Sequence, residues 1–76
     1  MICGRFRLNE AVRVVRLIAP GSDRGAISSI PAHSVIDVHG WASLRQMVEA
    51  TWNDESFAIF ESDLAERIEP EQALAE

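Results

Sequence analysis

The chain has 76 residues, of which 47% are hydrophobic, and it carries a formal net charge of −5. This length allows one domain at most, and a domain of this size buries only about 60% of the surface that its unfolded chain exposes, so self-association is an expected support. The acidic total argues against general nucleic-acid binding, which draws on a basic field that neutralises phosphates.

The single cysteine, Cys3, excludes a disulfide within the chain, and no set of Cys and His residues has zinc-finger spacing. A reduced, cytoplasmic setting is the simplest interpretation. No apolar run approaches the about 20 residues of a membrane helix. The N-terminus also lacks the apolar core of a signal peptide. We therefore expect a soluble, cytoplasmic protein without a membrane partner.

Charge is distributed unevenly. Residues 1–24 carry five Arg and two acidic residues, whereas residues 49–76 carry nine acidic residues and one basic residue, Arg67. The basic N-terminal segment can contact the acidic C-terminal segment of a neighbouring subunit. Alternatively, the two segments can lie on separate solvated faces of one subunit. Nucleic acid is the least favoured partner, and it would be contacted by Arg5, Arg7, Arg13 and Arg16.

In chain order, β-branched residues and period-two alternation predict the first strands. Residues 11–19 form one of them, with a helix capped by Asn9 as the alternative. After a loop that contains Pro and Gly, residues 26–30 and 33–40 form the next two. Residues 1–11 are either an extra strand or a loosely held arm.

The second half predicts two more strands, at residues 47–53 and 56–60, joined at a polar tip. The loop before them, residues 40–46, contains Trp41 and Leu44. Residues 61–68 form a single helical turn followed by a short return. Residues 69–76 are an acidic tail that is either frayed or briefly helical.

The apolar pattern of the two strands at residues 47–53 and 56–60 predicts which of their side chains face the core. If Asp54 and Glu55 form the tip, Ala50 pairs with Ile59. The core face of this hairpin then consists of Val48, Ala50, Trp52, Phe57 and Ile59. The other face is half-polar and consists of Glu49, Thr51, Ala58 and Phe60. Phe60 is the one large apolar residue on it. A slip of one residue would mix the two faces, so the apolar pattern opposes it.

Five short strands separated by turns predict an all-β fold, either a small barrel or a two-sheet roll. The order VEATW-NDES-FAIF-ESDL-AERI resembles the SH3-like barrels of bacteria, in which a Trp-polar turn leads to an aromatic strand, a one-turn helix and a final short strand. The resemblance covers residues 12–68. It implies a five-stranded SH3-like barrel, flanked by the N-terminal segment 1–11 and the acidic tail 69–76. These barrels host unrelated activities, so the resemblance gives no function.

A second resemblance concerns Phe57-Ala58-Ile59-Phe60 and the following LAERI. It is similar to the Val-Gln-Ile-Tyr pore strand of the tetrameric, plasmid-borne type II dihydrofolate reductases, which precedes an Ala-Leu-Glu-Arg-Ile-like ending. Only Ile59 matches. Ala58 and Phe60 cannot supply the polar contacts of the amide and the phenol. The resemblance implies a shared architecture without the reductase activity.

The opening MICGRF looks like the Met-Cys-Gly-Arg start of the SRAP family, whose N-terminal Cys crosslinks to abasic DNA. Here Ile2 separates Met1 from Cys3, so removing Met1 would not make Cys3 the terminal residue. That family's domain is also much longer. We interpret Cys3 as a structural or surface thiol; an activated thiol would need a nearby cation, for which Arg5 is the nearest candidate.

Three polar residues, His33, Asp37 and His39, fall on one face of a predicted strand. Six residues of strand separate the two His by about 20 Å, so they cannot share a metal. Asp37 and His39 would need a third ligand from elsewhere. We interpret all three as solvent-facing residues.

The carboxylate pairs Asp54/Glu55 and Glu61/Asp63 lie at the hairpin tip and in the helical turn. We expect Ser62 or Asp63 to cap that turn instead of acting in acid–base chemistry. The sequence has no Gly-rich phosphate loop, no Ser-His-Asp order and no nucleophile elbow. We therefore expect no catalytic residue, no metal site and no cofactor.

Trp41, Leu44 and Phe60 are the apolar residues that this pattern leaves outside the core face. Aromatic residues dominate interface cores, so these three form a hypothetical contact surface. The alternative is that they close the monomer's own core. The predicted function is a non-catalytic bacterial module for self-association or for binding another protein. The alternative function is a small ligand-binding or enzymatic homo-oligomer with a site at its symmetry axis.

Overall fold

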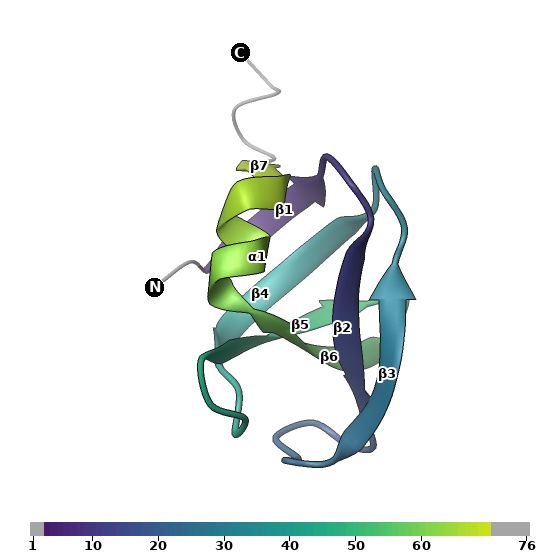
Figure 1. Cartoon of the computed structure of the whole chain (residues 1–76), viewed down its shortest axis with the longest axis vertical. Helices are drawn as coiled ribbons and strands as arrows, with labels where there is room; N and C mark the ends of the chain where they lie inside the picture. Colours follow the sequence, from purple (N-terminus) through teal and green to yellow (C-terminus); the bar gives the residue numbers. More distant parts are fainter. Residues whose placement is uncertain (1–2, 71–76) are drawn as a thin grey trace.

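The structure, a computed structural model, describes residues 3–70. Seven strands form one antiparallel sheet in the order β3-β2-β6-β5-β4-β1-β7. One short helix accompanies the sheet (Figure 1). The predicted all-β class is confirmed. Residues 71–76 of the predicted acidic tail lie outside the described residues.

The elements follow one another along the chain as β1 (Gly4–Leu8), β2 (Val12–Leu17), β3 (Gly25–Ile30), β4 (Val35–Trp41), β5 (Met47–Trp52), β6 (Glu55–Phe60), α1 (Glu61–Arg67) and β7 (Ile68–Pro70). In Figure 1 the β2–β3 hairpin stands upright on one side of the molecule, and α1 is on the other, drawn in front of β1. β4 and β5 cross behind the hairpin.

The strands β2 to β6 correspond to the five that the sequence predicts, and two more come from the ends of the chain. β1 is an integral strand, because it pairs with β4 on one side and with β7 on the other. The helical alternative for residues 11–19 is wrong, since Val12–Leu17 is a strand. The predicted single helical turn is longer than expected and spans seven residues in α1.

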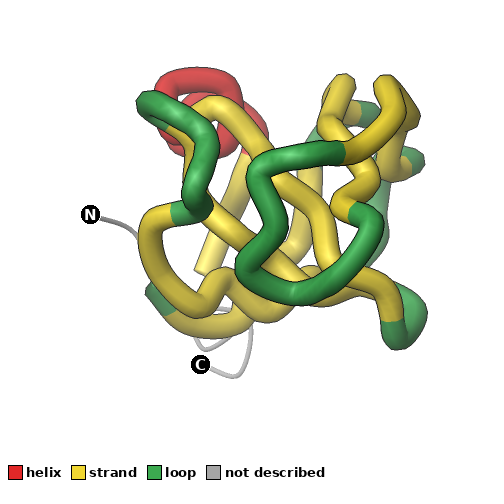
Figure 2. The backbone as a smooth tube through the Cα atoms, turned by 90° about the horizontal axis from the view of Figure 1, so that it is seen from below, coloured by secondary structure: helices red, strands yellow, loops and turns green. Residues whose placement is uncertain are grey.

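The sheet is curled: in Figure 1, β2 and β3 stand upright whereas β5 and β6 run across the molecule. Its strand order departs from the chain order, because β2, the first of the five predicted strands, pairs with β6, the last. β2 contacts β6 through the pairs Val15↔Ala58 and Arg16↔Phe57. β3 and β4 are consecutive in the chain, yet within the described residues they are not paired. Figure 2 shows the chain winding around its interior when the molecule is seen from below.

One face of the sheet encloses the main core, together with α1. The buried members of this core are Leu8, Val12, Val14, Ile30, Ile36, Val38, Val48, Ala50, Phe57, Ile59 and Leu64. Trp52 packs against them half-buried, and its ring centroid lies 6.0 Å from that of Phe57. The residues named from the sequence as the hairpin's core face therefore lie in or against this cluster. None of the buried residues between 3 and 68 is polar or charged.

The β5–β6 hairpin has a register two residues away from the predicted one. Ala50 pairs with Phe57 instead of Ile59. The turn consists of Asn53 and Asp54, with φ of 54° and 64°, as in a two-residue type I′ turn. Asn and Asp tolerate this left-handed region better than Glu does. A shift of two residues keeps every side chain on its predicted face, because side chains alternate with a period of two.

Replacing Asp54 by Gly is expected to stabilise the protein, because Gly adopts a positive φ without the steric cost of about 1 kcal/mol that a Cβ brings. The greater freedom of Gly in the unfolded chain offsets part of this gain, so the free energy of unfolding should rise by about 0.5 kcal/mol. Asp54→Val, with a branched Cβ, should lower it by about 1 kcal/mol or more. Urea unfolding followed by tryptophan fluorescence measures both changes, and a less stable Asp54→Gly variant would contradict the turn.

Candidate interaction surface

The outer face of the sheet, which points away from the main core, carries a second apolar cluster. Leu17, Met47 and Ala58 are buried in it, and Val15, Ala42 and Leu44 pack against it half-buried. The loop between β4 and β5 folds over this cluster through two backbone hydrogen bonds: the N–H of Ala42 donates to Met47, and the N–H of Met47 donates to Leu44. This face is therefore drier than the half-polar face that the sequence predicts.

The loop between β2 and β3 is also tied to the outer face. Both carboxylate oxygens of Glu49 accept hydrogen bonds from the N–H of Gly21, at 3.1 and 3.2 Å. The hydroxyl of Ser43 donates to the carbonyl oxygen of Gly21 at 2.8 Å. Gly21 has φ of 78°, a conformation that favours glycine. Glu49 thus holds a loop in place, and the two loops cover one end of the outer face.

The uncovered part of the outer face is apolar. Val15, Ile27, Met47 and Phe60 line a shallow groove there. Phe60 also lines a neighbouring hollow, together with Trp41. Phe60 lines both hollows, so the two are continuous. We call this continuous surface the apolar strip; it consists of Val15, Ile27, Trp41, Met47 and Phe60.

Strand pairing gathers the strip from distant parts of the sequence. Ile27 pairs with Val15 across β3 and β2, and Val15 pairs with Ala58 across β2 and β6. Met47 pairs with Phe60 across β5 and β6. Directly paired residues project to the same side of a sheet, so these side chains share the outer face.

Trp41 is the last residue of β4. The register against β5 shifts between Val38 and Gly40, and Trp41 then pairs with Val48, on the side of the main core. Because β4 ends there, the indole lies at the margin of the core and is 56% exposed. It lies in the hollow beside Phe60, next to the first residues of α1.

The structure brings together two of the three residues that the sequence singles out as a contact surface. Trp41 and Phe60 line one hollow, and both are exposed. Leu44 lies in neither of the two hollows and instead packs half-buried against the second cluster. Leu44 therefore serves the packing of the monomer.

The sequence pattern does not identify three members of the strip, Val15, Ile27 and Met47. A signal for Ile27 was present: Ile27 and Ile30 are three positions apart in one strand, so they face opposite sides. With Ile30 fully buried, Ile27 has to point outward, where it is 76% exposed. Met47 and Val15 have no comparable signal, because their place depends on which strands pair.

The His and Asp residues considered for metal binding are dispersed. His33 lies in the turn before β4 with φ of 71°, so its predicted place on a strand face is wrong. Asp37 pairs with Arg5, with 3.3 Å between Oδ1 and Nε. The Nε2 atom of His39 hydrogen-bonds to Oγ1 of Thr51. Within residues 3–70, no three His, Cys, Asp or Glu side chains are placed to hold a metal ion together.

Cys3 is exposed, and its Sγ donates to the carbonyl oxygen of His39 at 3.7 Å. The cation nearest in sequence, Arg5, pairs with Asp37. These contacts fit the interpretation of Cys3 as a surface thiol that lies against the end of the β1–β4 ladder.

The two carboxylate pairs make ordinary surface contacts. Glu55 lies 3.7 Å from Arg16, and Asp63 lies 3.5 Å from Arg67 one turn along α1. The predicted cap of this helix is wrong, because the N-cap residue is Phe60 and no side chain caps it. The acidic residues of the first turn instead interact favourably with the helix dipole.

No protein-family model, no curated protein and no solved structure matches the chain. In the described range, no helix is long and apolar enough to cross a membrane. Function is therefore inferred from the chain's own surface.

Leu44→Ala should lower the free energy of unfolding by about 1 kcal/mol, because Leu44 packs against the second cluster. The matched control is Ile18→Ala, which trims a side chain that is 74% exposed at the end of β2. This control should change stability by less than about 0.5 kcal/mol. Urea unfolding measures both, and equal effects would show that Leu44 is not part of the monomer's packing.

Proposed function

We propose that the chain is a non-catalytic interaction module that associates with itself through the apolar strip. The observation that carries this proposal is the exposure of three large apolar side chains on one continuous surface. Ile27, Trp41 and Phe60 are 76%, 56% and 45% exposed. A single exposed apolar residue needs no explanation, but a contiguous patch marks a contact surface.

The charges beside the strip favour a second copy as its occupant. Arg13 and Asp63 line the same groove as Ile27 and Phe60. Asp63 contacts Arg67, whereas within the described residues Arg13 has no ion-pair partner. In a two-fold dimer each surface meets its own copy, so Arg13 of one subunit can face Asp63 of the other.

The small size of the chain supports the same function. A chain of 76 residues has a limited core, and such domains gain support from association. Covering the strip would remove from water apolar surface that the monomer leaves exposed. The reduced, cytoplasmic setting inferred from the single cysteine remains part of this proposal.

We also propose that the curled sheet is an SH3-like barrel of the bacterial kind, extended by β1 and β7. The pairing of β2 with β6 and the position of α1 before the last strand support this. The alternative function, a ligand-binding or enzymatic oligomer, needs polar groups around a shared cavity. The strip is lined mainly by apolar side chains, which favours a protein contact.

Phe60→Glu should reduce the mass of the associated protein, because it places a charge at the centre of a desolvated contact. Trp41→Ser should weaken association by removing an aromatic contact. The matched control is Ala11→Glu, which introduces the same charge at an exposed apolar residue that lines neither the strip nor the hollow along the β2–β3 hairpin, and it should leave the mass unchanged. Sedimentation over a range of protein concentrations measures the mass, and circular dichroism checks the fold.

Two outcomes would overturn the proposed function. One is a wild-type protein that sediments as a monomer at every concentration. The other is a pair of folded Phe60→Glu and Trp41→Ser variants with the mass and concentration dependence of the wild type.

A further inference from the structure

β3 is the last strand at one end of the sheet. It pairs with β2, and this is its only partner strand within residues 3–70. Outside this ladder, no hydrogen bond to residues 25–30 occurs in the described part of the chain. One long side of β3 therefore presents unpaired backbone groups.

The register identifies these groups. The N–H of Ile18 donates to the carbonyl of Arg24 at 3.1 Å, so these two residues form a hydrogen-bonded pair. In an antiparallel ladder such pairs recur at every second residue. The residues of β3 that bond to β2 are therefore Ala26, Ser28 and Ile30. The residues that direct both N–H and C=O away from β2 are Gly25, Ile27 and Ser29.

This edge lacks the usual protection against strand addition. Exposed edges are normally blunted by charged side chains, Pro or bulges. The segment 25–32 contains no charged residue, and its only Pro is Pro31, beyond the end of β3. The β2–β3 register runs without a shift from Val12↔Ile30 to Leu17↔Gly25.

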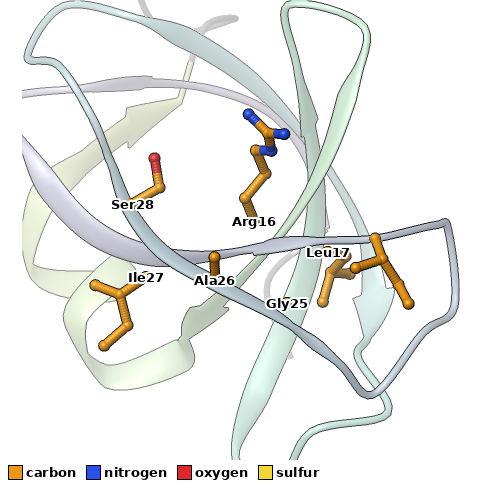
Figure 3. Close-up of a pocket in the computed structure, with 7 residues that line it drawn as sticks. Arg16, Leu17, Gly25, Ala26, Ile27 and Ser28 are labelled. Atoms are coloured by element: carbon orange, nitrogen blue, oxygen red, sulfur yellow. The ribbon is translucent and has the colours of Figure 1, made fainter.

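Within the described residues no other strand covers the free side of β3. A hollow of about 510 Å³ lies over the β2–β3 ladder and is lined by residues 16–18 and 25–28 (Figure 3). In Figure 3, Ile27 projects from one side of the ribbon, and Arg16 and Ser28 project from the other. The row of free backbone groups lies between these two sides.

We propose that β3 of a second copy pairs antiparallel with this edge, about a two-fold axis at Ile27. The pairing rests on the proposed self-association and adds to it a second contact, made by the backbone of residues 25, 27 and 29, which shares only Ile27 with the apolar strip. Ile27 faces Ile27 of the partner subunit, and Gly25 faces Ser29 of the partner subunit. All the outward groups of residues 25, 27 and 29 then find a partner.

A second copy fits this edge because the edge is complementary to itself. The outward residues are spaced symmetrically around Ile27, so a two-fold rotation matches donors with acceptors. The rotation brings two Ile27 side chains together, with about 5.5 Å between their Cα atoms. Ile27 is the most exposed large apolar residue among those described, at 76%. No like charges oppose each other in the paired segment, although the chain carries −5.

Two self-complementary contacts on one subunit generate a closed assembly. A strip contact and an edge contact, each with its own two-fold axis, give a tetramer when the axes intersect at right angles. The edge contact spans five residues, or about 17 Å, which is small compared with a standard interface. We therefore expect it to depend strongly on protein concentration.

Amide hydrogen exchange on the intact chain tests the pairing residue by residue. The amides of Ala26, Ser28 and Ile30 should be protected at every concentration, because they bond to β2. The amides of Ile27 and Ser29 should be protected only at concentrations where the protein associates, by about tenfold when nine-tenths is associated. Fast exchange at Ile27 and Ser29 in the associated protein would overturn the pairing.

A matched pair of variants tests the backbone contact separately from side chains. Ser29→Pro removes an outward N–H and no bond to β2, which is the kind of edge position where Pro is tolerated. Ser29→Ala keeps this N–H and is the control. By sedimentation, Ser29→Pro should halve the mass of the assembly, and Ser29→Ala should leave it unchanged. The double variant Phe60→Glu/Ser29→Pro should be a monomer.

These measurements separate the edge pairing from the proposed function. If Ser29→Pro keeps the wild-type mass while Phe60→Glu lowers it, the edge pairing is overturned and the strip contact stands. If the wild-type protein is a monomer at all concentrations, both are overturned. Should Ser29→Pro fail to fold, the amide exchange of the wild-type chain still decides.

Discussion

The pairing of β5 with β6 determines both faces of the sheet at once. Val48 and Ile59 form one directly opposed pair and are fully buried on the inner face. The adjacent pair, Met47 and Phe60, must then project to the outer face, because successive side chains alternate. The register that builds the core therefore also places an exposed aromatic side chain outside it. The inner packing and the apolar strip have the same physical origin.

The small size of the chain explains why the outer face is partly covered. A sheet of this length encloses a limited core, so burial on the second face adds stability. Two loops cover part of this face. Glu49 and Ser43 hydrogen-bond to Gly21, and Leu44 packs against the cluster that contains Met47. The loop before β5 reaches the residue next to Phe60, where the N–H of Glu61 donates to the carbonyl oxygen of Gln46, but Phe60 itself stays 45% exposed and the strip stays open. The uncovered part of this face is therefore where the fold still has apolar surface to bury.

The sequence predicts the elements better than their pairing. The all-β class and the two faces of the β5–β6 hairpin follow from alternation, which is a local signal. The observed register differs from the predicted one by two residues because the choice of turn depends on backbone angles: Asn53 and Asp54 accept a positive φ more readily than Glu55. That chemistry was readable, but alternation alone does not distinguish two registers that differ by two residues.

The strip was only partly predictable for a different reason. The residue pattern identifies Phe60 and Trp41 as apolar residues outside the core face. It gives no sign of the register shift between Val38 and Gly40, after which Trp41 pairs with Val48, because a bulge depends on the partner strand. The contribution of Ile27 likewise requires that β2 lie between β3 and β6. Long-range pairing of this kind leaves no local pattern.

The two ends of the sheet differ in a way that bears on assembly. β7, at one end, is three residues long and contains Pro70, which has no N–H to offer to an added strand. β3, at the other end, is six residues long and has neither Pro nor charge. An open edge of this kind leads to unlimited aggregation when strands add head to tail, but a two-fold contact consumes the edge and stops growth. Because β3 is the one unprotected edge among the described strands, antiparallel pairing of β3 with β3 ends the growth of the sheet on that side.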